Sequence, residues 1–494
     1  MKTFATTIGL FALAVSAVPS TYHRPGLVQS NQLRRDLTRS ALLEHAKKLQ
    51  GFAEVTAPAI TRVAGSRGHN LTVDYIYDTL VKTGYYDVEL QTFTYVFSEG
   101  NVTVSAAGTS YESQYFQYAP AGTVEAPLIS VSNFGCEAAD FPTTVSGNIA
   151  LVSRGTCEFG LKVALAGGAG AKGIIIYNNV PGPVGGGTLG PDERPEGKYI
   201  PAGSLSQEDA LSLISKLNNG TSITANLDVD ALVETRYTNN VIATSKCGDQ
   251  SNIVFSGGHT DSVQAGPGIN DDGSGSMGIL EIALQLTKFT VNNAVRFGFW
   301  SAEEFGLLGS EHYITTAPAE ELAKISLYLN FDMIASPNFA YFIYDGDGSA
   351  FNTTGPAGSD HIEHLFEDYF TSVGIKTAPT AFDGRSDYGP FLDVNIPSGG
   401  LFTGAEGLKT PEEVIWWGGE AGVAYDVNYH AAGDDITNLN MGAWIQNTKA
   451  AAHAIATYAV STEGIPKRTG QQKRGVKSDK PKARCGEDIP IAVM

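Results

Sequence analysis

Hydrophobic residues recur with a helical spacing in the first part of the chain. The leucines of "NQLRRDLTRSALLEHAKKLQGFAE" (residues 31–54) are spaced to share one face of a helix, and "LTVDYIYDTLVKTG" (residues 71–84) follows with similar spacing. Apolar side chains that return every three to four positions indicate an amphipathic helix. Each stretch is therefore predicted to be one helix.

Between residues 108 and 235 the pattern changes to short apolar runs separated by loops rich in Gly and Pro. "APLISVS", "GNIALVSRG" and "KGIIIYNN" are predicted strands, and "CEFGLKVALAG" is a predicted helix. We interpret this block as a small α+β domain, rich in strands, inserted in the chain. Its "GAGAKG" matches the dinucleotide fingerprint, but it ends a helix and precedes a strand, the reverse of the required order. We therefore reject nucleotide binding.

From Thr238 onward, predicted strands and helices alternate. The strands are "NIVFSGG", "AVRFGFW", "ISLYLNFDMI" and "IPSGGLFTG". Helices are predicted at residues 275–289, 309–318, 359–374 and 442–461. This alternation predicts an α/β fold with a mixed, mostly parallel central sheet and helices on both faces.

The two ends of the chain indicate export. "MKTFATTIGLFALAVSAVPS" has the form of a secretory signal cut after Ala17, and no later stretch has the roughly 18 apolar residues of a membrane span. We expect a secreted protein, with a vacuolar or lysosome-like compartment as the alternative. The basic tail lacks apolar periodicity and is expected to be disordered. The expected segments are a signal peptide (1–17), a leader open to trimming (18–38), a main domain in two parts (39–107 and 236–462), the inserted domain (108–235) and the tail (463–494).

The formal net charge of −19 excludes nucleic acid as a partner, because an acidic surface repels phosphate backbones. We expect a monomer. In an oxidising compartment four cysteines favour two disulfides, for which we expect Cys136–Cys157 and Cys247–Cys485 among three possible connectivities. Sequons for N-glycosylation lie at Asn70, Asn101, Asn219 and Asn352.

Histidines and carboxylates follow the predicted strands. In such sheets, ligands gather beyond the carboxyl ends of the strands. Two imidazoles with three or more carboxylates suit zinc and fit a site for two metal ions. The residues concerned are His259, Asp261, Asp271, Glu303, Glu304, Asp332 and His430.

Six motifs, in order, resemble those of the M28 family of di-zinc aminopeptidases. They are "GGHTDSV", "GINDDGSGS", "SAEEFGLLGS", "NFDMI", "GRSDYGPF" and "NYHAAGDD". The inserted block resembles a protease-associated (PA) domain. Together the two parts are similar to secreted leucine aminopeptidases of fungi and to vacuolar aminopeptidase Y, and the resemblance extends from about residue 40 to 462. It implies a zinc-exopeptidase fold.

The resemblance implies two zinc ions per chain. One would be bound by His259 and Asp332 and the other by Glu304 and His430, with Asp271 as a bridge. A water shared by the two ions would be acidic enough to supply hydroxide near neutral pH.

Further roles follow from the same resemblance. Glu303 would act as general base, and Asp261 would orient His259. Arg385 and Tyr429 would contribute to substrate binding, and the peptide bond after Asp271 would be cis.

Two positions depart from the family pattern. Relatives commonly have a pair of cysteines that clamps the loop around His430, where this chain has Asn428 and Gly433. Many relatives have Asn after the bridging aspartate, where this chain has Asp272.

The function predicted is that of a secreted zinc aminopeptidase that removes neutral or hydrophobic, leucine-like residues from peptides with a free N-terminus. Carboxypeptidase and glutaminyl cyclase activity on the same scaffold are alternatives, although a carboxypeptidase needs a cationic pocket and Arg385 is the one contributor we identify. A binding protein without catalysis is a further alternative, but such receptors lack the ligands and carry a membrane anchor.

Overall fold

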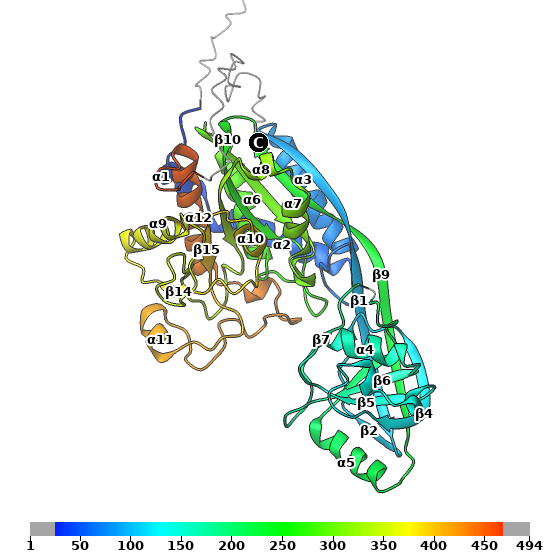
Figure 1. The fold of residues 1–494 in the computed structure, drawn as a ribbon. Coiled ribbons are helices and arrows are strands. Elements are labelled where there is room, and N and C mark those ends of the chain that lie inside the picture. The colour runs from blue at the N-terminus through cyan, green and yellow to red at the C-terminus, as the bar shows by residue number, and fades with distance from the viewer. Residues whose placement is uncertain (1–24, 193, 468–494) are drawn as a thin grey trace, which may run out of the picture.

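The computed structural model describes residues 25–192 and 194–467, which form two units joined by a long ribbon of two strands (Figure 1). The predicted signal peptide, the first part of the leader, most of the tail and Cys485 lie outside the described residues. Among the described residues, no helix combines the length and the apolar character needed to cross a membrane.

The larger unit is built on a mixed sheet with strand order β14-β13-β15-β12-β10-β11-β9-β1, in which β1 spans Tyr86–Ala106. The four strands β15, β12, β10 and β11 are parallel to one another, whereas β13 and β9 run antiparallel to their neighbours β15 and β11. The mostly parallel sheet predicted from the sequence is confirmed. The strand bounds are β9 (Thr224–Ser245), β10 (Asp249–His259), β11 (Asn293–Trp300), β12 (Ile325–Phe331), β13 (Phe342–Tyr344), β14 (Ala378–Thr380) and β15 (Ser398–Phe402).

Helices cover both faces of this sheet, as predicted. One face packs against α1 (Ser30–Asp36), α2 (Arg39–Glu54), α3 (Arg67–Thr83), α6 (Gly273–Leu286), α9 (Ser359–Ser372) and α12 (Met441–Val460). The other packs against α7 (Leu308–Thr316), α8 (Ala319–Leu322) and α10 (Gly389–Asp393). The short helix α11 (Pro411–Trp417) lies beyond the sheet and contacts the first core through Trp417.

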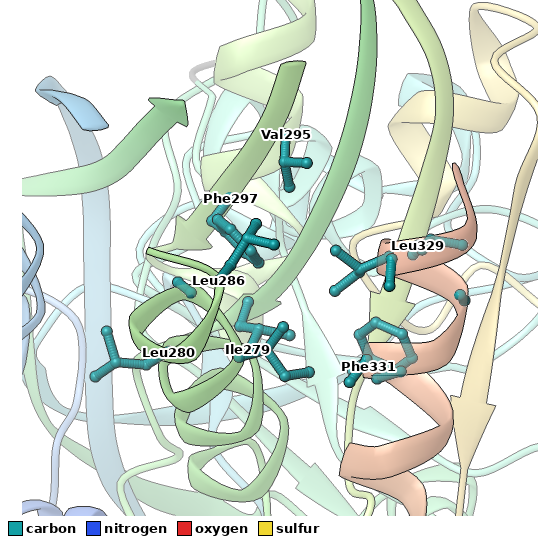
Figure 2. Close-up of a cluster of buried hydrophobic side chains, with 14 of the residues drawn as sticks. Ile279, Leu280, Leu286, Val295, Phe297, Leu329 and Phe331 are labelled. Atoms are coloured by element: carbon teal, nitrogen blue, oxygen red, sulfur yellow. The ribbon is translucent and has the colours of Figure 1, made fainter. Parts of the chain in front are cut away.

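Helix α6 lies at the centre of the first core. Figure 2 shows Ile279 and Leu286 of this helix beside Phe297 of β11 and Leu329 of β12. Successive side chains of a strand point to opposite faces, so Val295 and Phe297 both meet the helix. This packing fixes the helix start, and with it the residues just before Gly273, against the carboxyl ends of the strands.

The single helix predicted over residues 31–54 is wrong in one respect, because the structure has two helices there. α1 ends at Asp36, Leu37 and Thr38 are extended, and the Thr38 side chain accepts a hydrogen bond from Ala41 N at 3.2 Å. A threonine that caps a new helix satisfies a free backbone amide and so allows the chain to turn. Leu33 and Leu37 are nevertheless buried, as their spacing predicts.

The inserted unit has its own two hydrophobic cores on either side of a small sheet. The strands and helix predicted from the apolar runs are confirmed as β4, β5, β6 and α4, and the "GAGAKG" glycines end α4 and lead into β6. The bounds are β2 (Thr109–Tyr111), β3 (Phe116–Gln117), β4 (Gly122–Ser130), β5 (Ile149–Ser153), α4 (Phe159–Gly168), β6 (Gly173–Tyr177), β7 (Gly187–Thr188), β8 (Ala202–Leu205) and α5 (Gln207–Asn218).

Two long strands connect the units. β1 (Tyr86–Ala106) pairs antiparallel with β9 without a register shift, from Tyr86 opposite Ser245 to Ala106 opposite Ala225. Figure 1 shows both strands leaving the larger unit together and entering the inserted unit at their far ends. The sequence patterns did not predict this ribbon.

Candidate metal centre

The predicted metal ligands meet at one edge of the larger sheet. β10 ends at His259, which pairs with Trp300 at the end of the parallel strand β11. Asp332 directly follows β12, and Glu303 begins a short 3₁₀ turn (Glu303–Phe305) after β11. Because these strands are parallel and adjacent, their carboxyl ends deliver the side chains to the same place.

The five expected ligands form two halves that share Asp271. His259 Nε2 lies 3.1 Å from one oxygen of Asp271 and 3.7 Å from Asp332 Oδ1. His430 Nε2 lies 3.3 Å from the other oxygen of Asp271 and 3.1 Å from Glu304 Oε2. The two oxygens of one carboxylate thus face two different imidazoles. This arrangement suits a carboxylate shared by two cations.

Asp271 is held from the backbone side. The Asp271–Asp272 peptide bond is cis, as the family resemblance implies. Asp434, which the sequence analysis did not select, accepts the backbone amides of Asn270 at 2.8 Å and of Asp271 at 3.0 Å. The side chain of Asp271 therefore remains directed at the two histidines.

Asp272 also lies within reach of His259 and Asp332. Its carboxylate accepts the backbone amides of His259 at 3.1 Å, Gly275 at 2.8 Å and Met333 at 3.1 Å. Both oxygens of Asp272 therefore accept backbone amides. Through these bonds Asp272 connects the end of β10, the start of α6 and the segment after β12, and it caps α6.

Asp261 links His259 to the two glutamates. Fully buried, it accepts the backbone amides of Glu303 at 3.1 Å and Glu304 at 3.4 Å, and its Oδ1 lies 3.7 Å from His259 Nδ1. The Glu303 side chain approaches the site more loosely, with Oε2 3.8 Å from His259 Nε2. Asp261 thus faces the ring nitrogen of His259 that points away from Asp271.

The donor atoms fit a cation. Glu304 Oε1 and Asp332 Oδ1 are buried and, among the described residues, have no hydrogen-bond partner. Burial raises the pKa of Glu303 well above its usual value, that of Glu304 to about 7 and that of Asp332 to about 6. Buried carboxylates without partners are costly, and a cation among them removes that cost. Imidazole nitrogen with carboxylate oxygen is a donor set typical of zinc.

A cavity of about 300 Å³ opens beside these ligands. Carboxylates form one side, while Leu307, Tyr344, Tyr388, Phe402 and Ala405 supply an apolar side.

Arg385 and Tyr429, the expected substrate-binding residues, both line the cavity. The Arg385 guanidinium donates to Tyr429 Oη at 3.1 Å and pairs with Glu406 at 2.9 Å, while the Tyr429 ring stacks on His430.

The loop that carries His430 is held without cysteines. The Asn428 side chain lies against Gly433 and donates to Asn438 Oδ1 at 2.7 Å. Buried Asp426 accepts hydrogen bonds from Asn438 Nδ2 at 2.9 Å and from Asn270 Nδ2 at 2.7 Å. A network of amide and carboxylate groups therefore fixes this loop to the segment that carries Asp271.

Two further residues that were not predicted from the sequence support the site. Arg62 is fully buried, and its guanidinium donates to the backbone carbonyls of Thr260, Pro267 (at 2.8 Å) and Gly268. Ser386 Oγ donates to Asp332 Oδ2 at 2.5 Å. An arginine between apolar residues in "AITRVAGS" was a signal for the first, because a charge there must be paired.

Outside the site, the Cys136–Cys157 disulfide is confirmed. Cys247 is disulfide-bonded, while its expected partner Cys485 lies outside the described residues. All four sequon asparagines are exposed, as glycosylation requires: Asn70, Asn101, Asn219 and Asn352.

Comparisons with known proteins agree with this geometry. Residues 240–455 match peptidase family M28, and residues 124–213 match the PA domain. The chain is 53% identical to the probable leucine aminopeptidase 2 of Aspergillus fumigatus, over 86% of this chain and 85% of that one. It is 49% identical to leucine aminopeptidase 2 of Trichophyton rubrum, over 93% of this chain and 92% of that one.

Solved structures with the same fold include two bacterial enzymes. An aminopeptidase from Aneurinibacillus sp. strain AM-1 matches with a TM-score of 0.68 and 27% identity, over 87% of this chain and 95% of that one. A zinc aminopeptidase from Bacillus subtilis matches with a TM-score of 0.60 and 25% identity, over 86% of this chain and 98% of that one.

Proposed function

The chain belongs to peptidase family M28, and from this premise we propose that it is a zinc-dependent aminopeptidase. Its substrates are peptides with a free N-terminus, from which it removes neutral or hydrophobic, leucine-like residues. The observation that carries the proposal is Asp271, whose two oxygens face His259 and His430 beside a cavity with an apolar side. The relatives at about half identity are named leucine aminopeptidases, and the Bacillus subtilis neighbour is a zinc enzyme.

We assign two zinc ions to the chain. His259 and Asp332 would hold one, Glu304 and His430 would hold the other, and Asp271 would be shared by both. The unpartnered buried oxygens of Glu304 and Asp332 support this assignment. When bound, zinc acidifies water and polarises the carbonyl of the scissile peptide bond.

Glu303 is the residue that moves the proton. It lies next to Glu304 in sequence but farther from the imidazoles, which leaves its carboxylate available to take a proton from water and pass it to the leaving amine. Asp261 accepts the Glu303 amide and faces His259 Nδ1, so it orients the imidazole and the proton-transfer group together.

The cavity suits the amino end of a peptide. The carboxylates of Glu303 and Asp332 can receive a cationic α-ammonium group, and the apolar side receives the first side chain. Arg385 already pairs with Glu406, so its charge is not available for a substrate carboxylate. This pairing disfavours a carboxypeptidase.

We further propose that the protein is exported, acts as a monomer and binds no nucleic acid. A disulfide and exposed sequon asparagines support export, and a net charge of −19 disfavours nucleic acid as a partner. The inserted domain is assigned to residues 108–235, between the two parts of the peptidase domain.

The function is tested with leucine p-nitroanilide and its N-acetyl form, assayed side by side. Acetylation removes the cation that the buried carboxylates face, and each charge-assisted contact is worth roughly 1.5–3 kcal/mol. We expect kcat/KM to fall by several orders of magnitude on acetylation. Comparable rates on the two substrates would rule out an aminopeptidase, and the zinc content of the same sample checks the metal assignment separately.

A further inference from the structure

A second group of carboxylates lies outside the candidate metal centre, where β13 leads toward α9. Asp345 directly follows β13, Asp347 comes two residues later, and Glu363 lies in the second turn of α9. One oxygen of each lies within 4.8 Å of the other two. Neither the proposed reaction nor the family comparison uses these residues.

Backbone amides hold the three carboxylates in place. Asp345 Oδ2 accepts the amides of Ala350 at 3.0 Å and Phe351 at 2.9 Å, and Asp347 Oδ1 accepts that of Ser349 at 2.7 Å. Glu363 Oε2 accepts the amides of Gly346 and Asp347 at 2.9 and 3.0 Å. In each residue the amides bind one oxygen. The second oxygen of Asp345, Oδ1, is buried and has no partner among the described residues.

No ion pair among the described residues compensates the cluster, although the exposed His364 of α9 acts on Asp347 from a distance. Asp345 is 1% and Glu363 4% exposed, and none of the ion pairs among the described residues involves either of them or Asp347. Burial raises the pKa of Glu363 to about 7. Buried carboxylates that face each other without a counter-charge are unfavourable, so the cluster either holds a proton or binds a cation.

We propose that Asp345, Asp347 and Glu363 bind a divalent cation, with Ca²⁺ as the ion that fits best. All donors are oxygens, which calcium prefers and which disfavour zinc. The sequence Asp345-Gly-Asp347-Gly-Ser349 presents oxygen-bearing side chains at alternate positions, as calcium-binding loops do.

The unpartnered oxygen of Asp345 is the second, independent observation for this site. Asp345 is buried and belongs to the cluster, and its Oδ1 has no hydrogen-bond partner among the described residues, so a cation bound there would supply the missing partner. Gly348, with φ +73°, makes the turn that brings Asp347 and Ser349 back toward Asp345.

A cation here would stabilise one wall of the substrate cavity. Tyr344, the residue before Asp345, lines that cavity and stacks on Phe382 with ring centroids 5.0 Å apart. The Asp345 amide also donates to Thr380 O at 2.8 Å, and Thr380 lines the same cavity. Binding would tie β13 to α9 directly behind these residues, so its effect is structural and adds to that of the catalytic metal ions.

The test uses the full chain saturated with zinc, so that calcium cannot act by filling the catalytic site. The protein is dialysed against millimolar CaCl₂ and then against calcium-free buffer, and bound calcium is measured by elemental analysis. We expect about one calcium per chain and a Tm that is higher by about 4 °C or more in millimolar CaCl₂. No bound calcium together with an unchanged Tm would overturn the proposal.

Three variants separate a cation site from a buried proton. Asp347→Asn changes an exposed side chain, so it should fold and should weaken calcium binding about tenfold or more. Asp368→Asn, at another exposed position of α9, is the matched control and should keep the full response to calcium. Glu363→Gln should lose the gain in Tm, and a Glu363→Gln protein as stable as the wild type in millimolar CaCl₂ would show that Glu363 is held as a neutral acid.

Discussion

At the scale of single residues, two adjacent glutamates have different surroundings. Glu304 Oε2 lies 3.1 Å from His430, whereas Glu303 Oε2 comes no closer than 3.8 Å to His259. The chain turns after β11 at Ala302, whose φ is +59°, and the two carboxylates that follow approach different imidazoles. The same pair of residues can thus serve metal binding and proton transfer.

This difference leads to a prediction about metal content. Glu303→Gln should keep about two zinc ions but lose kcat by ~10²–10⁴-fold, because it removes a base and not a ligand. Asp271→Ala should lose both ions, because each half of the site depends on it. The measurement is zinc per chain with kcat. Zinc loss in Glu303→Gln would mean that the two glutamates have exchanged roles, and full zinc in Asp271→Ala would exclude the bridge.

Most residues of the candidate site could be predicted at this scale, because the ligands follow the predicted strands and lie within the motifs that resemble family M28. Arg62 could not, since its partners Thr260 and Gly268 lie about two hundred residues along the chain. Asp345 and Glu363 were missed for a similar reason. Their closeness depends on how β13 meets α9, and no periodicity in the sequence encodes that contact.

His69 leads to a prediction about pH. Burial lowers the pKa of this fully buried imidazole to about 4, and Nδ1 accepts the amide of Gly65. Because its folded pKa lies below the unfolded value of 6.5, its contribution to stability is complete above about pH 6.5 and is lost as the pH falls toward 4. The loss amounts to roughly 3 kcal/mol when complete.

The measurement is the free energy of unfolding of the wild type and of His69→Gln from pH 8 to pH 4. Zinc content is measured in both proteins at each pH, so that the difference between the two curves at equal zinc content is assigned to His69. The wild type should be the steeper of the two below pH 6.5. Parallel curves would show that His69 is not held in its neutral form.

At the scale of elements, the segment from His259 to α6 is the part of the fold that the site depends on most. It has no regular structure between β10 and α6, yet its residues are almost all buried. Arg62 donates to the carbonyls of Thr260, Pro267 and Gly268, and among the described residues only the Gly268 carbonyl has another backbone donor, Gly273 N at 3.1 Å. One buried side chain therefore replaces the hydrogen bonds that a secondary structure would supply.

Arg62→Met should accordingly destabilise the protein by about 3 kcal/mol or more, because it leaves the buried carbonyls of Thr260 and Pro267 without a donor. Zinc affinity should fall as well, since Asp271 follows this segment. Urea unfolding and zinc titration are the measurements, and Arg67→Met, at an exposed position on α3, is the control. A variant with wild-type stability and zinc affinity would show that the segment is held in another way.

Elements that face a core were predicted from the sequence, and elements that do not were missed. The middle of β9 is exposed, with Leu232 41%, Val233 40% and Tyr237 72% accessible. Its apolar side chains therefore do not mark a buried face, and the strand exists because β1 pairs with it. The break between α1 and α2 was missed because both helices bury leucines with the same spacing, and the Thr38 cap interrupts the backbone without interrupting the pattern.

At the scale of the whole molecule, the ribbon of β1 and β9 carries the inserted unit away from the sheet (Figure 1). The end nearest the peptidase unit is tied to the region of the site, since Phe97 contacts Phe305 and Gln264 donates to Ser98 O at 3.1 Å. The residues between Ser98 and its partner Val233 form the outer part of the ribbon and the inserted unit.

Because the register of this ribbon is unbroken, the inserted unit can be removed without changing how β1 and β9 pair in the peptidase unit. Ser98 and Val233 already lie opposite each other, so a two-residue Asn-Gly turn can join them and close the ribbon as an ordinary hairpin. We expect the shortened chain to fold and to hydrolyse leucine p-nitroanilide within about a factor of ten of the full chain, because domains with their own cores fold independently. A shortened protein that binds zinc but does not hydrolyse this substrate would mean that the inserted unit is needed for catalysis. If the shortened chain is active, the same two positions should accept a foreign domain in place of the natural insert.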